Sequence, residues 1–145
     1  MAFRFPLESV LRVRESLEKR EELALQKIQM QIAQTQNLIE NADKQLARIH
    51  AARADALENP VPARTLHLLQ LEEEGVNEIK KSLFQSLAEL EKQSVQQKAV
   101  YQAAHSNRQM LTDMKDQRRT EFDLEQTKTQ QKRLDDIFAA RSQRS

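Results

Sequence analysis

The three histidines are the side chains best suited to proton transfer or metal ligation, so their spacing is a first test for an enzyme. His50, His67 and His105 are far apart in the chain, and none belongs to a zinc-protease or nucleophile-elbow motif. The sequence has no cysteine and no glycine-rich phosphate-binding motif. We therefore expect no catalytic residue, no metal site and no cofactor.

Charged clusters are the other candidates for chemistry. The acidic run Glu72, Glu73 and Glu74 is typical of a solvated helix face. A basic cluster near the carboxyl end is either solvated surface or a docking site for an acidic partner. Its members are Arg118, Arg119, Lys128, Lys132 and Arg133.

The composition indicates long helices. Of the 145 residues, 31% are charged and 4% aromatic, with one glycine, three prolines and no tryptophan. Such a composition is typical of coiled coils, and so few aromatic rings cannot fill a large core. The net charge of +1 gives no general electrostatic reason to expect nucleic acid as a partner.

The sequence also lacks the hydrophobic segments of membrane insertion and secretion. No run approaches the ~20 apolar residues that span a bilayer. Arg4, Glu8 and Arg12 interrupt the apolar segment that a signal peptide would need. We therefore expect a cytoplasmic protein without direct membrane insertion.

The prolines predict where helices begin and end. Pro6 suits the first turn of a helix, where its missing N–H costs nothing. Pro60 and Pro62 force the residues before them out of helical geometry, which places a break near residue 61. We predict a single hairpin over residues 1–145, with a helix over about 6–58, a turn at about 59–63 and a second helix over about 64–140.

Two heptad tracks support this hairpin. The first helix carries a coiled-coil pattern in which all residues but one are apolar: Leu25, Ile28, Ile32, Thr35, Ile39, Ala42, Leu46 and Ile49. The second helix has a track repeating every seven residues: Leu69, Val76, Leu83, Leu90, Gln97, Ala104 and Leu111.

Folding the chain at residue 61 brings these tracks into phase. It places Leu46 opposite Val76, Ile39 opposite Leu83, Ile32 opposite Leu90 and Leu11 opposite Leu111. We therefore predict an all-α fold, a long antiparallel two-helix coiled coil. Upstream, Val10, Leu17 and Ala24 follow a track shifted by one position, which predicts a stutter near residue 20.

The two helices differ in predicted length, and this leaves a C-terminal helical overhang. The first helix ends opposite residue 116, so the residues beyond it have no partner within the chain. Because isolated helices are only marginally stable, we expect another protein to cover this end. Phe3 and Phe5 lie beside it and are expected to belong to the same unpaired end.

The residues after the turn present two faces. Helical spacing puts Leu66, Leu69 and Val76 on the coiled-coil side. Leu68, Leu71 and Gly75 fall on the opposite side, away from the first helix. They are either scattered exposed residues, which are common, or a patch that binds a partner through helically spaced anchors.

Both ends of the chain resemble a known family. The opening FRFPLESVLRVRE and the closing EQTKTQQKRLDDI are similar to the flagellar export proteins of the FliJ family. Residues 131–137 match the family ending QK-x-[LM]-[DE]-[DE]-[IF] position by position. The resemblance extends over nearly the whole chain.

The resemblance implies a non-enzymatic component of the flagellar type III export apparatus, peripheral to the inner membrane. FliJ proteins are similar in shape to the central stalk of rotary ATP synthases. Their paired termini enter the hexameric export ATPase ring (FliI), their other end contacts the export-gate protein FlhA, and they also have a chaperone-escort role with export chaperones.

Position and physical character assign residues to these contacts. The expected ring-binding residues are Phe3, Phe5, Arg118, Arg119, Phe122, Lys132, Leu134, Ile137 and Phe138. The expected gate-binding residues are Leu68, Leu71 and Gly75.

Two other functions remain open at this point. One is the equivalent stalk protein of a virulence-type secretion system. The other is a generic coiled-coil tether or scaffold, which would bury its heptad tracks between chains. The stalk reading predicts a monomeric hairpin instead.

Overall fold

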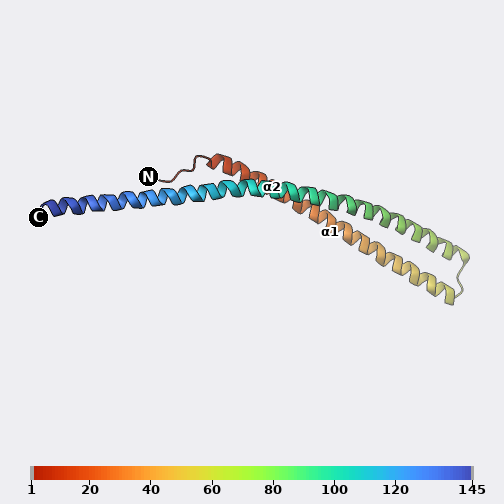
Figure 1. The fold of residues 1–145 in the computed structure, drawn as a ribbon. Helices are drawn as coiled ribbons and strands as arrows, with labels where there is room; N and C mark the ends of the chain where they lie inside the picture. Colours follow the sequence, from red (N-terminus) through yellow and green to blue (C-terminus); the bar gives the residue numbers. More distant parts are fainter. Residues whose placement is uncertain (1, 145) are drawn as a thin grey trace. The chain divides into compact units, whose positions relative to one another are not determined.

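The computed structural model describes residues 2–144, which contain two α-helices and no strand. Helix α1 spans Glu8–Glu58 and helix α2 spans Ala63–Arg144 (Figure 1). The helices pack against each other in opposite directions, and residues 59–62 connect them. The predicted all-α hairpin is therefore confirmed.

Contacts divide the chain into two units. The terminal unit comprises Met1–Arg20 with Tyr101–Ser145, and the turn unit comprises Glu21–Val100. Each helix runs without interruption through both units.

The opening segment turns before α1 begins. The Glu8 N–H donates to the Phe5 carbonyl at 3.2 Å, and the Leu11 N–H donates to the Leu7 carbonyl at 2.9 Å. Pro6 and Leu7 thus form a turn, and α1 starts at Glu8, two residues after the predicted start. The acidic Glu8 lies in the first helical turn, where the helix dipole favours negative charge.

The connection between the helices follows from its prolines. The Asn59 N–H still donates to the Asp55 carbonyl at 3.0 Å, but α1 ends at Glu58. Pro60 and Pro62 have no N–H to continue the ladder. The Thr65 N–H donates to the Pro62 carbonyl at 2.9 Å as α2 begins.

Each unit has its own apolar core. In the turn unit, Ala42, Ile49 and Val76 are buried, with Leu46 and Leu69 packed against them. In the terminal unit, Phe5, Leu11 and Leu111 are buried, and partly buried side chains pack on them. Leu46 thus shares a cluster with Val76 and Leu11 with Leu111, as the predicted register requires.

The predicted stutter near residue 20 is wrong. Val10 and Leu17 are exposed, at 40% and 42%. The less exposed positions of α1 instead continue the main track towards its start, at Leu11, Arg14 and Glu18. Polar side chains occupy this part of the track, so a search for apolar residues followed the wrong face.

Polar residues occupy several inward positions of α2 as well, and two of them bond to α1 as follows. Lys80 Nζ lies 2.5 Å from Asp43 Oδ1, and Gln97 Nε2 donates to Glu21 Oε2 at 2.6 Å. No buried side-chain N or O atom between residues 2 and 144 lacks a hydrogen-bond partner. Such pairs favour one register of the helices because a shift would separate the bonded groups.

Neither helix, over residues 2–144, contains a segment long and apolar enough to cross a membrane.

Candidate partner-binding sites

His105 and His50 lie beside glutamates that also bind arginine. His105 Nδ1 lies 3.4 Å from Glu18 Oε1, while Arg108 Nε donates to Glu18 Oε2 at 2.5 Å. The Arg108 hydrogen bond is the main cause of the lowered pKa of Glu18; burial opposes it and His105 adds to it. These contacts join α1 to α2 within the terminal unit.

A second group of the same kind lies in the turn unit. Glu73 accepts a hydrogen bond from Arg53, and His50 Nε2 lies 3.2 Å from its other oxygen. The Arg53 hydrogen bond is the main cause of the lowered pKa of Glu73, and His50 contributes less. The prediction that the whole acidic run is a solvated face is therefore wrong for Glu73, which occupies an inward heptad position.

These groups have a structural role. Each glutamate contacts one arginine and one histidine and lies partly exposed at the seam between the helices. His67 is exposed on α2. Within residues 2–144, no cluster of His, Asp or Glu has the arrangement of a metal site.

The opening phenylalanines do not belong to an unpaired end. Phe5 is only 7% exposed and packs with Leu11 and Leu111. The Phe3 and Phe122 rings lie 5.6 Å apart, and the Arg118 guanidinium lies 5.9 Å from the Phe5 ring centre. The expectation that Phe3 and Phe5 are unpaired was wrong, because the opening segment packs onto α2.

The bare part of α2 therefore starts later than expected. Phe122 and Gln126 are the last partly covered positions, and every described residue beyond them is exposed. We call residues 127–144 the bare arm. Leu134, Ile137 and Phe138 are 56%, 51% and 66% exposed on it.

The three apolar side chains of the bare arm share one helix face. Their spacing of three and four residues places them side by side. Lys132 lies exposed on the same arm, whereas Arg119 is exposed on α2 before it. A short apolar patch bordered by charge is typical of a protein-binding helix.

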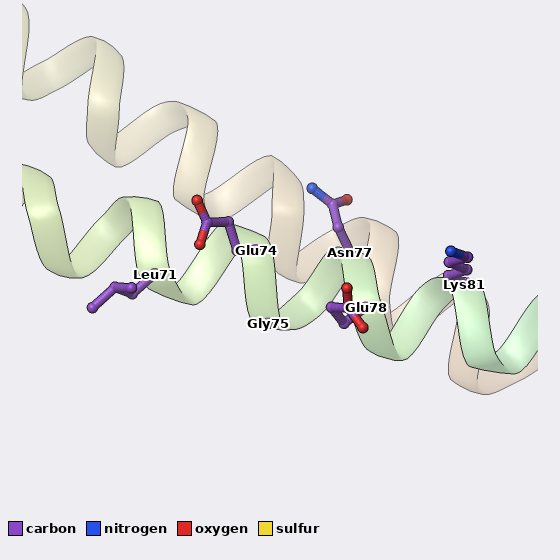
Figure 2. A pocket seen from close by; sticks show the side chains of 6 residues that line it. All are labelled: Leu71, Glu74, Gly75, Asn77, Glu78 and Lys81. Atoms are coloured by element: carbon purple, nitrogen blue, oxygen red, sulfur yellow. The ribbon is translucent and has the colours of Figure 1, made fainter.

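A second exposed apolar surface lies just after the turn. Leu68 and Leu71 are 55% and 49% exposed on the side of α2 away from α1. Gly75 follows one helical turn later, and a shallow groove runs past it between Leu71 and Lys81 (Figure 2). We call Leu68, Leu71 and Gly75 the tip patch.

Gly75 contributes no side chain to the lining of this groove. A Cβ built at Gly75 meets no atom within 4 Å. The glycine has no positive φ, so the helix does not require it. Glycine destabilises a helix interior by about 1 kcal/mol relative to alanine. The fold therefore gives no reason for glycine at this position.

A further group of residues was missed by sequence reasoning. Arg4, Arg12, Lys115 and Arg119 line one pocket of the terminal unit. The antiparallel register would have predicted that Arg4 lies near Arg119 only if the packing of the opening segment onto α2 had been known.

Comparisons with known proteins identify the family. The family model described as Flagellar FliJ protein matches residues 3–145. Comparisons with curated proteins and with solved structures found no match. The family match covers essentially the whole described hairpin, including both ends that carry the resemblance. The chain belongs to the FliJ family of flagellar proteins and is a component of the flagellar export apparatus.

Proposed function

We propose that this chain is the non-catalytic stalk of the export ATPase complex. In this proposal the terminal unit inserts into the hexameric export ATPase ring, FliI, and the turn unit contacts the export-gate protein FlhA. The complex would work in the cytoplasm, peripheral to the inner membrane, and the hairpin would also escort export chaperones. Family membership supports a role in export.

The bare arm carries the ring part of the proposal. Its exposed Leu134, Ile137 and Phe138 have no packing partner among the described residues. An isolated helix of this kind gains stability when another protein covers its apolar face. A ring with a central opening suits a single helix, because the ring can contact every face of that helix.

The burial of the expected ring-binding residues divides them into those that pack within the terminal unit and those that are exposed. Phe5 is buried, and Phe3, Arg118 and Phe122 already contact each other or Phe5. We propose that these residues shape the terminal unit, while Arg119, Lys132 and the apolar side chains of the bare arm contact the ring.

The tip patch supports the gate part of the proposal. Leu68 and Leu71 point away from α1, and the groove at Gly75 lets another backbone approach closely. The tip patch lies in the turn unit, so the two proposed contacts use different units.

Steady-state ATP hydrolysis by the export ATPase tests the ring contact. The full chain is compared with a chain lacking residues 127–145, a cut that spares the contacts of Phe122. We expect the full chain to stimulate hydrolysis and the shortened chain to fail. Equal rates with either chain and with none would reject the ring-inserting stalk.

Point variants separate the two ends. The combination Leu134→Gln, Ile137→Gln and Phe138→Gln is expected to lose ATPase stimulation but retain binding to the cytoplasmic part of FlhA. Leu68→Gln with Leu71→Gln is expected to show the opposite pattern. Loss of both readouts in either variant, with helicity unchanged, would contradict separate contacts.

A further inference from the structure

The terminal unit contains a strongly cationic pocket. It has a volume of about 460 Å³ and lies between the opening segment, the first turns of α1, and α2. Its cationic side chains are Arg4, Arg12, Lys115 and Arg119.

Most of this charge is uncompensated. The only carboxylate of the lining is Glu8, whose Oε2 lies 2.8 Å from Lys115 Nζ. Arg4, Arg12 and Arg119 are exposed and form no ion pair with any residue between 2 and 144. Three guanidinium groups around one concave site therefore remain available to an anionic ligand.

The pocket also has an apolar wall. Phe3 and Phe5 complete the lining, and Phe5 is anchored in the core of the terminal unit. Because Phe5 is fixed by packing, the wall that it forms with Phe3 has a defined position. A ligand that fits this pocket has several negative charges and an apolar group beside them.

We propose that this pocket binds an acidic segment of a partner protein, through carboxylates on Arg4, Arg12 and Arg119 and an aliphatic or aromatic side chain against Phe3. Each guanidinium can bind one carboxylate with two parallel hydrogen bonds. Three separate guanidinium groups suit several spaced carboxylates better than one compact phosphate.

Carboxylates also fit better than phosphate for a second reason. Phosphate sites often use free backbone N–H groups at a helix amino terminus. In α1 that end already carries the Glu8 carboxylate, and its N–H donates to the Phe5 carbonyl. Of the three guanidinium groups, only Arg119 also belongs to the proposed ring contact. The peptide-binding test below contains no ATPase, so its outcome is separate from that of the stalk proposal.

Fluorescence anisotropy with a rhodamine-labelled peptide tests the proposal. The probe has the sequence Glu-Asp-Glu-Leu-Glu-Asp, and the protein is the full chain. We expect the triple variant Arg4→Glu, Arg12→Glu and Arg119→Glu to bind the peptide at least about tenfold more weakly, because each lost charge-assisted contact weakens binding.

The matched control has the same change in net charge. Arg20, Arg48 and Arg64 are exposed outside the pocket and are replaced by Glu together. We expect this control to weaken binding by less than about threefold, since exposed and distant charges are screened by salt. Equal weakening in the two triple variants would show a diffuse charge effect and overturn the pocket.

Two further measurements test the shape of the site and its ligand. Phe5→Ala keeps every cation but removes the anchor of the apolar wall, so peptide binding is expected to fall while circular dichroism verifies that the helices remain. Inorganic phosphate at the same ionic strength as a chloride control is expected not to compete. Unchanged binding by Phe5→Ala, or competition by phosphate, would overturn the proposal.

Discussion

Phe5 is the residue on which the arrangement of the chain termini depends. It is the first buried side chain from residue 2 onwards, and it joins the opening segment to α1 and α2 through Leu11 and Leu111. Its ring is also faced by Arg118, which adds a cation–π contact. The opening segment thus packs against α2 at Leu111 and at Phe122.

Phe5→Ala is expected to lower the free energy of unfolding by about 3 kcal/mol, because it removes a buried aromatic ring and leaves a cavity. Urea unfolding followed by circular dichroism measures the change. Phe138→Ala is the matched control, since Phe138 is 66% exposed. It should change the unfolding free energy by less than about 0.5 kcal/mol. Equal effects of the two variants would contradict the burial of Phe5.

Glu18 makes stability dependent on pH. Its pKa in the folded protein is lowered from 4.5, mainly by the Arg108 hydrogen bond. The ionised carboxylate therefore stabilises the folded state above pH 4.5, and this contribution is lost as pH falls through the lowered pKa.

Glu18→Gln is accordingly expected to be less stable than the original chain at neutral pH, and the difference should shrink as pH falls below 4.5. Urea midpoints at several pH values measure it. Glu91→Gln, at an exposed site, is the control and should show no such trend. A difference independent of pH would contradict the role of the Glu18 charge.

The fold does not require glycine at position 75, because Gly75 has no positive φ and an added Cβ would meet no neighbour. Gly75→Ala is expected to raise the free energy of unfolding by about 1 kcal/mol through helix propensity, because the added methyl group meets no neighbour. Ala88→Gly, at an exposed position of α2, is the reverse control and should lower stability by a similar amount. If Gly75→Ala destabilises the chain, the groove is not open as described.

At the scale of elements, the burial of α2 side chains differs along the length of the helix. From Leu69 to Leu111 its inward side chains are buried or half-buried and several of them contact α1, whereas residues 127–144 are exposed on every face. Arg141 and Arg144 lie in its last turn, where positive charge suits the helix dipole. The bare arm is thus held mainly by its own backbone hydrogen bonds.

Hydrogen exchange measures this difference. Backbone amides of residues 127–144 are expected to exchange much faster than those of residues 73–111, because helices without packing open locally. Addition of the export ATPase should slow exchange in the bare arm if the ring covers it. Equal protection of both segments in the free chain would contradict the assignment of the bare arm as unpacked.

At the scale of the whole molecule, the heptad tracks are used within one chain. The buried residues of the α1 track pack against α2 in both units, so these positions are already covered within one chain. This arrangement favours the stalk over a tether that buries its tracks between chains.

The free chain is therefore expected to be a monomer of 16.9 kDa. Its helicity and thermal midpoint should stay constant over about a hundredfold dilution, since an oligomer would lose stability by mass action. Sedimentation equilibrium and circular dichroism measure both quantities. A midpoint that falls on dilution would favour the tether.

Much of the fold could be predicted from local sequence patterns. Pro60 and Pro62 placed the turn, because a residue without an N–H cannot continue a helix. The track from Leu25 to Ile49 predicted the packed face, because apolar side chains at this spacing lie on one stripe of a helix. Both signals depend only on neighbours in the chain.

The sequence misled where the inward face is polar or the backbone leaves the helix. Glu18 takes an inward position because it bonds to Arg108 on the other helix, and no apolar pattern indicates such a pair. Glu73 turned inward for the same reason, towards Arg53.

By itself, then, the sequence determined the class of the fold, the turn and the bare end of α2, since proline chemistry and helical periodicity are local. Only the tertiary structure decided that Phe3 and Phe5 fold back onto α2 and that Arg4, Arg12 and Arg119 share a pocket. These arrangements join residues more than 100 positions apart. They depend on the path of a short non-helical segment, which no periodic pattern describes.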